Sequence, residues 1–124
     1  MDATKLIALR KELKKTHKDL TMLPFFIKAL SLAMEEYPLM NSVVNPEIDS
    51  EGYIKEYVIK HDHNFAVAID SPDGLTTPLI KNCNQKSIMQ INKDLRALVD
   101  KAASGGLTKD DFEGGTFSVS SFVD

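Results

Sequence analysis

The feature that most constrains the fold of this chain is a run near its end, where two glycines precede alternating apolar and hydroxyl residues. Gly114 and Gly115 are followed by Thr-Phe-Ser-Val-Ser-Ser at positions 116–121. Paired glycines favour a turn, and a period of two is typical of a strand. Such a strand presents Phe117 and Val119 on one face and hydroxyl groups on the other. We therefore interpret the residues upstream as the scaffold that positions these hydroxyl groups.

Composition places the chain among ordinary globular proteins of one domain at most. It has 124 residues, of which 43% are hydrophobic and 27% are charged, and this balance is enough for a modest core. The net charge of −3 gives no strong positive field, so we expect no nucleic acid partner. No stretch approaches the roughly 20 apolar residues of a membrane helix, so we expect no membrane partner. The single cysteine, Cys83, excludes an internal disulfide framework.

Two helices are predicted in the first third of the chain. Asp2 is a suitable N-cap for a helix that reaches about Lys15, and Thr21 is a suitable N-cap for the next one. Proline disfavours helical geometry at the residue before it, so the second helix must end before Pro38. Apolar residues surround nearly its whole circumference, which predicts that it is buried.

A third helix is predicted by signals at both of its ends. Ser87 is followed three residues later by Gln90, which is the spacing of a capping box. Apolar residues then recur at helical spacing until Gly105 and Gly106, which end the helix.

The middle of the chain has the pattern of short strands. Residues 39–45 and 53–60 flank a polar turn and predict a hairpin. Residues 64–69 are small and apolar and predict a strand buried on both faces. A turn at residues 71–74 leads into a strand over residues 75–80, which Pro78 interrupts. The order of helices and strands predicts an α+β fold, with a mixed sheet covered on one side by helices.

Three places in the sequence allow a structural and a functional interpretation. Arg10 belongs to a basic run, which either forms a solvated helix face or lets Arg10 meet an anionic ligand. Asp70 follows a buried strand, where it either caps the turn or meets a ligand. His61 and His63 are either part of an exposed loop or strand end, or two ligands of a metal ion, but no third ligand is evident, so no metal site is predicted. The sequence also has no phosphate loop, dinucleotide fingerprint or glycine-flanked nucleophilic serine.

Six segments together carry a resemblance to a known family. They are Leu-Arg-Lys-Glu-Leu-Lys at 9–14, Leu-Pro-Phe-Phe-Ile-Lys-Ala at 23–29, Tyr-Pro-Leu-Met-Asn at 37–41, His-Asn-Phe-Ala-Val-Ala-Ile-Asp at 63–70, Gly-Leu through Pro at 74–78, and Gly-Gly-Thr-Phe at 114–117. They resemble the catalytic domain of the dihydrolipoamide acyltransferase (E2) components of 2-oxo acid dehydrogenase complexes, whose fold is shared with chloramphenicol acetyltransferase. Within that family, residues 78–82 followed by Ser87 and Ile88 look most like the branched-chain enzyme.

The resemblance implies an enzyme that moves an acyl group between dihydrolipoamide and coenzyme A. In the family a histidine, within a His-x-x-x-Asp-Gly motif, is the general base on the thiol, and a serine hydroxyl stabilises the oxyanion. Alignment on the Gly-Gly-Thr-Phe motif makes Ser120 that serine. The alternative is that Ser120 is an ordinary strand hydroxyl facing water.

The resemblance also implies a binding path for coenzyme A, which is a substrate. Arg10 matches an arginine suited to the nucleotide phosphates. The other positions that match this path are Thr21, Asp70, Val99, Ser120 and Ser121. Family members usually have asparagine where this chain has Ser121, so that contact is shorter here. The segment between Arg10 and Thr21 is also shorter than in similar proteins.

The chain departs from the family in what it lacks. None of its three histidines, His17, His61 and His63, lies in a His-x-x-x-Asp-Gly motif. The resemblance therefore predicts that residues 1–124 are a partial catalytic domain, without its C-terminal half, the lipoyl domain that carries the lipoyl group, and the subunit-binding domain. In the family the serine and the histidine of one site come from different subunits, so we expect this fragment alone to be inactive.

Two other functions stay open from the sequence, a non-catalytic scaffold subunit of the same complex and an independent small-molecule acetyltransferase. The partners that the resemblance implies are a homotrimer that assembles into a larger core, and the E1 and E3 components, which bind through the missing regions. The implied localisation is the mitochondrial matrix in a eukaryote and the cytoplasm in a bacterium.

Overall fold

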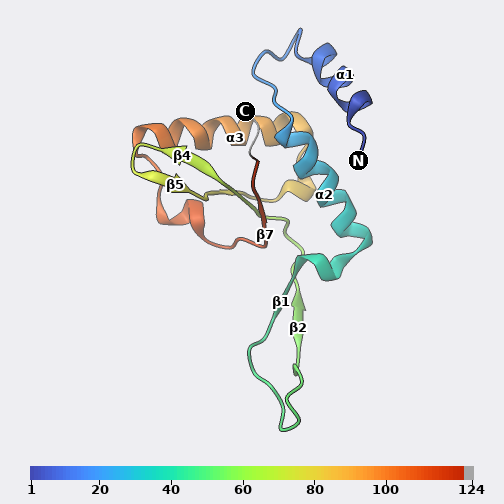
Figure 1. Cartoon of the computed structure of the whole chain (residues 1–124). Coiled ribbons are helices and arrows are strands. Elements are labelled where there is room, and N and C mark those ends of the chain that lie inside the picture. The colour runs from blue at the N-terminus through green and yellow to red at the C-terminus, as the bar shows by residue number, and fades with distance from the viewer. Residues whose placement is uncertain (122–124) are drawn as a thin grey trace.

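Two helices and a three-stranded sheet form the body of the computed structural model, which describes residues 1–121 (Figure 1). The helices are α2 (Leu23–Glu36) and α3 (Ile88–Ser104), which pack on each other. In the sheet, β3 (Phe65–Val67) lies between β6 (Leu79–Ile80) and β7 (Phe117–Val119). β3 is antiparallel to β6 and parallel to β7. The predicted α+β fold with a mixed sheet is therefore confirmed.

The core lies between the helices and one face of β3. Phe65 and Val67 are two residues apart, so they share a face of the strand, and both are buried. Phe65 also makes an edge-to-face contact with Phe117, with ring centroids 5.7 Å apart. The side chains from the helices that complete this cluster are Ile27, Met34, Ile91, Leu95, Leu98 and Ala102. Ala66, on the other face, is only half-buried, so the prediction that this strand is buried on both faces is wrong for the face away from the helices.

Within residues 1–121 the strands form three small sheets instead of the single sheet that was predicted. Among these residues, β4 (Ile69–Ser71) pairs only with β5 (Gly74–Thr76), through the predicted turn. Gly74 has a φ of +110°, a conformation that favours glycine. Pro78 separates β5 from β6, as expected of a residue without a backbone donor. Its carbonyl still accepts a hydrogen bond of 2.9 Å from the Val67 N–H, so the chain returns to β3 after the proline.

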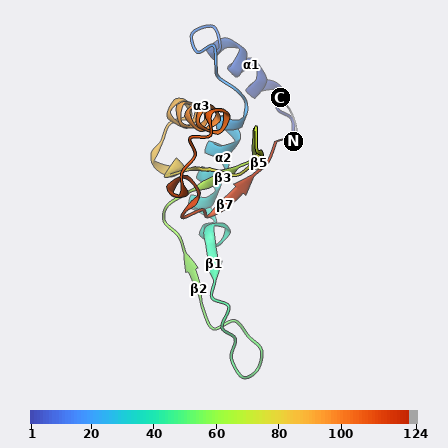
Figure 2. The ribbon, with the colours of Figure 1, turned by 90° about the vertical axis from the view of Figure 1, so that its left-hand side faces the viewer.

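The predicted hairpin forms a two-stranded arm that projects from the body (Figures 1 and 2). We use the term arm for residues 42–60, which include β1 (Ser42–Val44) and β2 (Tyr57–Ile59). The base of the arm is fixed by Asn41, the last residue of the 3₁₀ helix η1 (Pro38–Asn41). Its Nδ2 donates to the carbonyls of Lys60 at 2.9 Å and Asp62 at 3.0 Å. At the far end, Asp49 Oδ1 accepts from two backbone N–H groups of the turn.

The first helix, α1 (Thr4–Leu13), lies at the opposite end of the molecule from the arm (Figures 1 and 2). It is shorter than predicted, and its N-cap is Ala3 and not Asp2, although Asp2 Oδ1 accepts a 2.9 Å hydrogen bond from the Thr4 N–H. None of its residues is buried. No helix of the described residues is long and apolar enough to cross a membrane.

Two predictions for α2 are wrong in part. Met22, not Thr21, is its N-cap, and no side chain in the described part of the chain caps this end. Thr21 Oγ1 is buried and faces no partner among residues 1–121. The helix is also not buried all round, because Leu32 is 52% exposed. Its end before Pro38 is confirmed.

The ends of α3 follow the sequence closely. Ser87 Oγ accepts from the Gln90 N–H at 3.2 Å, and Gln90 Oε1 accepts from the Ser87 N–H at 2.8 Å. Gly105 ends the helix with a φ of +72°, as a left-handed C-terminal residue does. Two 3₁₀ helices, η2 (Cys83–Gln85) and η3 (Lys109–Phe112), precede and follow α3.

We expect Ser87→Ala to lower the free energy of unfolding by about 1 kcal/mol, because it leaves the first turn of α3 without its side-chain acceptor. Denaturant unfolding followed by circular dichroism measures this. The control is Ser104→Ala at the other end of α3, where the hydroxyl donates to the Lys101 carbonyl and no N-terminal donor depends on it. Equal effects of the two substitutions would contradict the role of the capping box.

Candidate functional site

The strand that carries the candidate serine is held by Asn64. The Asn64 Nδ2 group donates to the Gly114 carbonyl at 2.7 Å, and the Asn64 carbonyl accepts from the Thr116 N–H at 2.9 Å. Thr116 Oγ1 in turn accepts from the Asn64 N–H at 3.0 Å. Asn64 Oδ1 also accepts from the Asn82 N–H at 2.9 Å. One residue therefore joins the start of β3, the segment after β6 and the entry to β7.

The sequence analysis did not assign a positioning role to Asn64. Its side-chain partners lie 18 and 50 residues away in the chain, and no local pattern marks such a residue. The two glycines were found, and the structure gives the reason for each. Gly114 has a φ of +89°, and a Cβ on Gly115 would lie 3.0 Å from Leu79 Cδ2. Any side chain at position 115 would therefore crowd the end of the Leu79 side chain on β6.

Ser120 lies directly after β7 and is exposed. The predicted alternation is confirmed, because Phe117 and Val119 are half-buried while Ser118 is exposed. Val119 pairs with Val67 in the parallel register. Ser120 therefore lies just beyond the end at which both parallel strands finish.

Asp70 lies beyond the same end of the β3–β7 pair, since it follows β3 by three residues. It is exposed in β4, opposite Leu75. The side-chain hydrogen bond of the adjacent turn comes from Ser71, whose Oγ donates to the Gly74 carbonyl at 2.6 Å. The interpretation of Asp70 as the cap of that turn is therefore wrong, and the ligand interpretation stays a prediction.

Arg10 and Thr21 each contain a buried polar atom with spare hydrogen-bonding capacity. Within residues 1–121, neither Arg10 Nε nor Thr21 Oγ1 has a hydrogen-bond partner. An unsatisfied buried group costs about 1–3 kcal/mol, and an incoming acceptor for Arg10 would remove that cost. Arg10 is half-buried, while Lys11 and Lys14 next to it are exposed. The basic run is therefore not a uniformly solvated face.

Val99 and Ser121 have different surroundings. Val99 is half-buried on α3 and packs against the core cluster, so it has a structural role whatever else it contacts. Ser121 is exposed after Ser120. The predicted residues thus come from five separate parts of the chain: α1, the segment before α2, β4, α3 and the end of β7.

The two neighbouring histidines, His61 and His63, have opposite environments. His61 is exposed, whereas His63 is only 5% exposed. A hydrogen bond of 2.6 Å joins His63 Nδ1 to Ser31 Oγ on α2. The loop interpretation is therefore wrong for His63, which is a core residue that fixes the segment before β3 to α2. Within residues 1–121 no group of three metal-ligating side chains comes together.

Cys83 is fully buried beside the core. Its thiol donates to the Ile80 carbonyl at a distance of 3.4 Å. Burial raises the pKa of this thiol to about 11, although the nearby Lys86 opposes the shift. Because the thiolate is the reactive form, Cys83 is a structural residue and not a nucleophile.

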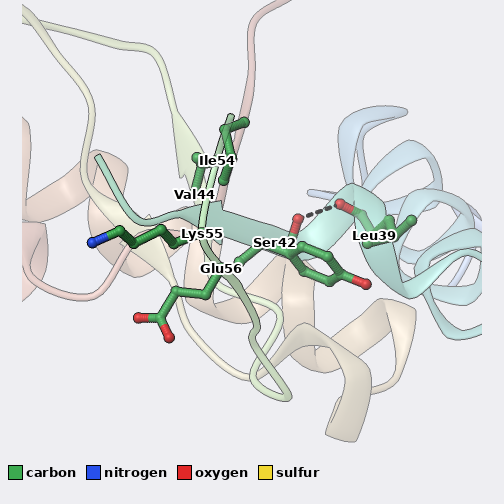
Figure 3. Close-up of a pocket in the computed structure, with 7 residues that line it drawn as sticks. Leu39, Ser42, Val44, Ile54, Lys55 and Glu56 are labelled. Atoms are coloured by element: carbon green, nitrogen blue, oxygen red, sulfur yellow. Dashed lines mark hydrogen bonds between the residues drawn. The ribbon is translucent and has the colours of Figure 1, made fainter. Parts of the chain in front are cut away.

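A further hollow lies on the arm and contains none of the predicted site residues. Its volume is about 590 Å³, and Figure 3 shows its lining around Leu39, Ser42 and Ile54. The lining has two hydroxyl groups, those of Ser42 and Tyr57, and Ser42 Oγ donates to the Leu39 carbonyl at 2.6 Å, so it is already engaged. This hollow has the character of a docking surface more than of a reaction centre.

Comparison with known protein families identifies the family of the chain. The family model of the 2-oxoacid dehydrogenases acyltransferase catalytic domain matches residues 1–123. The chain belongs to this family. The expected kinship with E2 catalytic domains is therefore confirmed.

Curated relatives and solved structures agree with this assignment. The chain is 39% identical over 119 residues to the lipoamide acyltransferase component of the branched-chain alpha-keto acid dehydrogenase complex of Caenorhabditis elegans, and covers 93% of itself and 25% of that protein. It is 32% identical over 123 residues to the acetyltransferase component of the pyruvate dehydrogenase complex of Bacillus subtilis, covering 96% of itself and 26% of the relative. The fold matches the dihydrolipoamide acetyltransferase of Azotobacter vinelandii with a TM-score of 0.87 at 34% identity, over 98% of this chain and 49% of that one. The chain thus spans about a quarter of the curated relatives and half of the solved chain.

Burial makes the stability of this acyltransferase-family fold depend on pH through His63. Loss of solvation lowers the pKa of His63 below its ordinary value of 6.5, with Lys28 acting in the same direction and Glu35 and Asp62 opposing. A depressed pKa means that the unfolded chain binds the proton more tightly than the folded one. The free energy of unfolding should therefore fall as the pH drops below 6.5 and level off below the folded-state pKa.

We expect His63→Asn to remove this part of the pH dependence. The control is His61→Asn, which changes an exposed histidine two residues away and should leave the dependence intact. Chemical denaturation at pH values between 5 and 8 measures both. A wild-type profile that is flat below pH 6.5, or one that His61→Asn flattens, would contradict the assignment.

Proposed function

We propose that this chain supplies the serine side of an acyl-transfer site, which moves an acyl group between dihydrolipoamide and coenzyme A within a 2-oxo acid dehydrogenase complex. Membership of the catalytic-domain family, together with the exposed hydroxyl of Ser120 directly after β7, carries this proposal. A crystallographic and enzymatic investigation of the Azotobacter relative concerned the roles of a serine, a histidine and an asparagine in its catalytic mechanism. A serine role is therefore consistent with the family.

The proposed chemistry of Ser120 is electrostatic. The thiolate of one substrate attacks the carbonyl carbon of the thioester, and the carbonyl π electrons move to oxygen. Ser120 Oγ–H donates a hydrogen bond to that oxyanion. The tetrahedral intermediate then collapses, the carbonyl re-forms, and the other thiolate leaves and takes up a proton. The base that removes the proton from the attacking thiol is, by the family resemblance, a histidine outside this chain.

The rigid entry to β7 supports this role. Ser120 follows a strand whose start is fixed by the hydrogen bonds of Asn64 and by the close packing of Gly115 on Leu79. A donor stabilises a transition state best when it is already oriented before the charge develops. The exposed hydroxyl therefore combines a fixed backbone with access to a substrate.

The proposed path for coenzyme A begins at Arg10 and Thr21. The buried Nε of Arg10 lacks an acceptor and Thr21 Oγ1 lacks a partner within the described residues, and phosphate oxygens suit a guanidinium group. We extend the path along Asp70, Val99, Ser120 and Ser121.

We propose that the natural acyl group is branched. Relatives named for the branched-chain complex are 39% and 36% identical to this chain. Pyruvate dehydrogenase relatives reach similar values of 36% and 39%, so identity alone does not separate the substrates. The kcat/KM values for a branched acyl, an acetyl and a succinyl group on dihydrolipoamide test this proposal directly.

We further propose that residues 1–124 form part of a larger catalytic domain, which assembles as a homotrimer into a core and binds the E1 and E3 components through other regions. The chain corresponds to 49% of the subunit of a cubic pyruvate dehydrogenase core that it matches with a TM-score of 0.87. A scaffold subunit without catalysis is the second candidate, because no histidine of these 124 residues lies in a His-x-x-x-Asp-Gly motif.

We expect Ser120→Ala in the protein as its gene encodes it to lower kcat by about 100- to 1000-fold, because one oxyanion donor is lost. The KM values should change little. The matched control is Ser118→Ala, which removes an exposed hydroxyl from the same strand. Steady-state transfer from acyl-dihydrolipoamide to coenzyme A measures both. Equal turnover of wild type and Ser120→Ala would remove the proposed role, and an inactive wild type would favour the scaffold subunit.

We expect Arg10→Gln to raise the KM for coenzyme A by about 10- to 100-fold, which corresponds to one charge-assisted hydrogen bond. The kcat should be nearly unchanged, because Arg10 is proposed to bind the nucleotide and not the reacting atoms. Lys5→Gln removes an exposed cation from the same helix and is the control. A KM that responds equally to both substitutions would indicate only the general charge of α1.

A further inference from the structure

The segment between α3 and β7 leads the chain into the strand that precedes the candidate serine. The chain leaves α3 at Gly105, turns through η3 and enters β7 at Phe117 (Figure 1). Within residues 1–121, the backbone–backbone hydrogen bonds of residues 108–113 join these residues only to one another. The placement of η3 on the body therefore depends on side chains.

Lys81 joins η3 to the segment that follows β6. Its Nζ group donates to the Asp110 carbonyl at 2.7 Å and lies 3.5 Å from Asp110 Oδ2. The Lys81 carbonyl in turn accepts from Lys86 Nζ at 2.6 Å, and Lys86 forms a 2.5 Å ion pair with Asp94 on α3. Hydrogen bonds from a charged donor are stronger than neutral ones. Because Lys81 bonds a backbone oxygen, it fixes the main chain of η3 as well as a side chain.

Lys101 joins η3 directly to α3. Its Nζ group lies 3.3 Å from Asp111 Oδ1, and Asp111 Oδ2 accepts from the Thr108 N–H at 2.9 Å. The bond from Thr108, together with Lys101, lowers the pKa of the Asp111 carboxyl, so this group is ionised at neutral pH. Only 14% of the Asp111 side chain is exposed, so solvent screens this pair less than an ordinary surface pair. One carboxylate thus connects the first turn of η3 to α3.

We use the term clamp for Lys81 and Lys101 with their partners Asp110 and Asp111. Gly114 follows the clamp by three residues, and its carbonyl accepts from Asn64 Nδ2 at 2.7 Å. The short link from η3 to β7 is therefore fixed at both of its ends. A link of three residues absorbs little movement, so a shift of η3 would reach the start of β7.

We propose that Lys81 and Lys101 are positioning residues for the acyl transfer, because they hold η3 and thereby set the place of the Ser120 hydroxyl. In this role the lysines do not touch the substrate, and they act through Ser120. A misplacement of about 1 Å can cost about 100-fold in rate, so a clamp remote from the chemistry can control kcat. This inference rests on the proposed function and adds to it the residues that orient its oxyanion donor.

Substitution of each lysine by methionine tests the proposal in the protein as its gene encodes it. Methionine keeps an unbranched stem and removes the charged donor. We expect Lys81→Met and Lys101→Met each to lower kcat by about tenfold, with the KM values for both substrates within about twofold of wild type. Lys81→Arg keeps a charged donor and should recover kcat to within about threefold of wild type. Steady-state acyl transfer measures these values, and circular dichroism verifies that each variant folds.

The matched control is Lys109→Met, which removes a cation from η3 itself. Lys109 is 90% exposed and forms a 3.3 Å ion pair with Glu113, so it does not join η3 to the body. We expect its kcat to stay within about twofold of wild type.

Combining each lysine substitution with Ser120→Ala separates a positioning role from general damage to the fold. Residues that act through one group have non-additive effects. Once the Ser120 hydroxyl is absent, we expect Lys81→Met to lower kcat by less than about twofold. General damage would lower kcat by the same factor in both backgrounds.

Three outcomes would overturn the proposal while Ser120→Ala still shows its expected loss. They are an unchanged kcat in both lysine variants, an equal loss in Lys109→Met, and the same factor with and without the Ser120 hydroxyl. Where Lys81→Met does not fold, Lys101→Met decides, since it removes the second contact of the clamp alone. Full turnover of Ser120→Ala, or an inactive wild type, would instead overturn the proposed function and this inference together.

Discussion

The hydrogen bonds of Asn64 are the interaction on which the arrangement of this fold depends. Three segments that are far apart in the sequence meet at this one side chain, whose amide donates to the Gly114 carbonyl and accepts from the Asn82 N–H. A side-chain amide can donate and accept at once. Asparagine therefore links one backbone segment through its carbonyl and another through its N–H group. Hydrogen bonds between the backbone of Asn64 and Thr116 also join β3 to the entry of β7, and the side chain adds the links to Gly114 and Asn82. Asn64, which lies outside β7, thus helps to position the strand that leads to Ser120.

The molecule divides its residues between a packed body and two uncovered segments. Phe65, Ile27 and Ile91 are fully buried between the helices and β3, while the arm and α1 have almost no buried side chain. The stability of the body therefore comes from its own packing, and the shape of the arm and of α1 depends on hydrogen bonds at their ends.

Local sequence patterns predicted the elements that local chemistry controls. The capping box of Ser87, the turn before Gly74 and the interruption at Pro78 each depend on residues a few positions apart, and each is confirmed. Predictions failed where the structure depends on contacts between residues that are far apart in the sequence. Thr21 is a good cap by its chemistry, yet α2 begins one residue later. His63 was expected to be exposed, but it is buried and forms a hydrogen bond with Ser31, which lies 32 residues away in the chain. For the candidate site, the sequence predicted the glycine turn and the exposure pattern around Ser120, whereas the role of Asn64 depends on contacts that no pattern records.

The burial of Cys83 has a consequence for a protein proposed to handle thiols and thioesters. Such substrates exchange acyl groups and disulfides with any accessible thiolate. The only cysteine of the chain has no exposed surface and a pKa of about 11, so at neutral pH it offers almost no thiolate and no route of approach. These 124 residues therefore add no accessible thiolate that would compete with the thiols of the substrates.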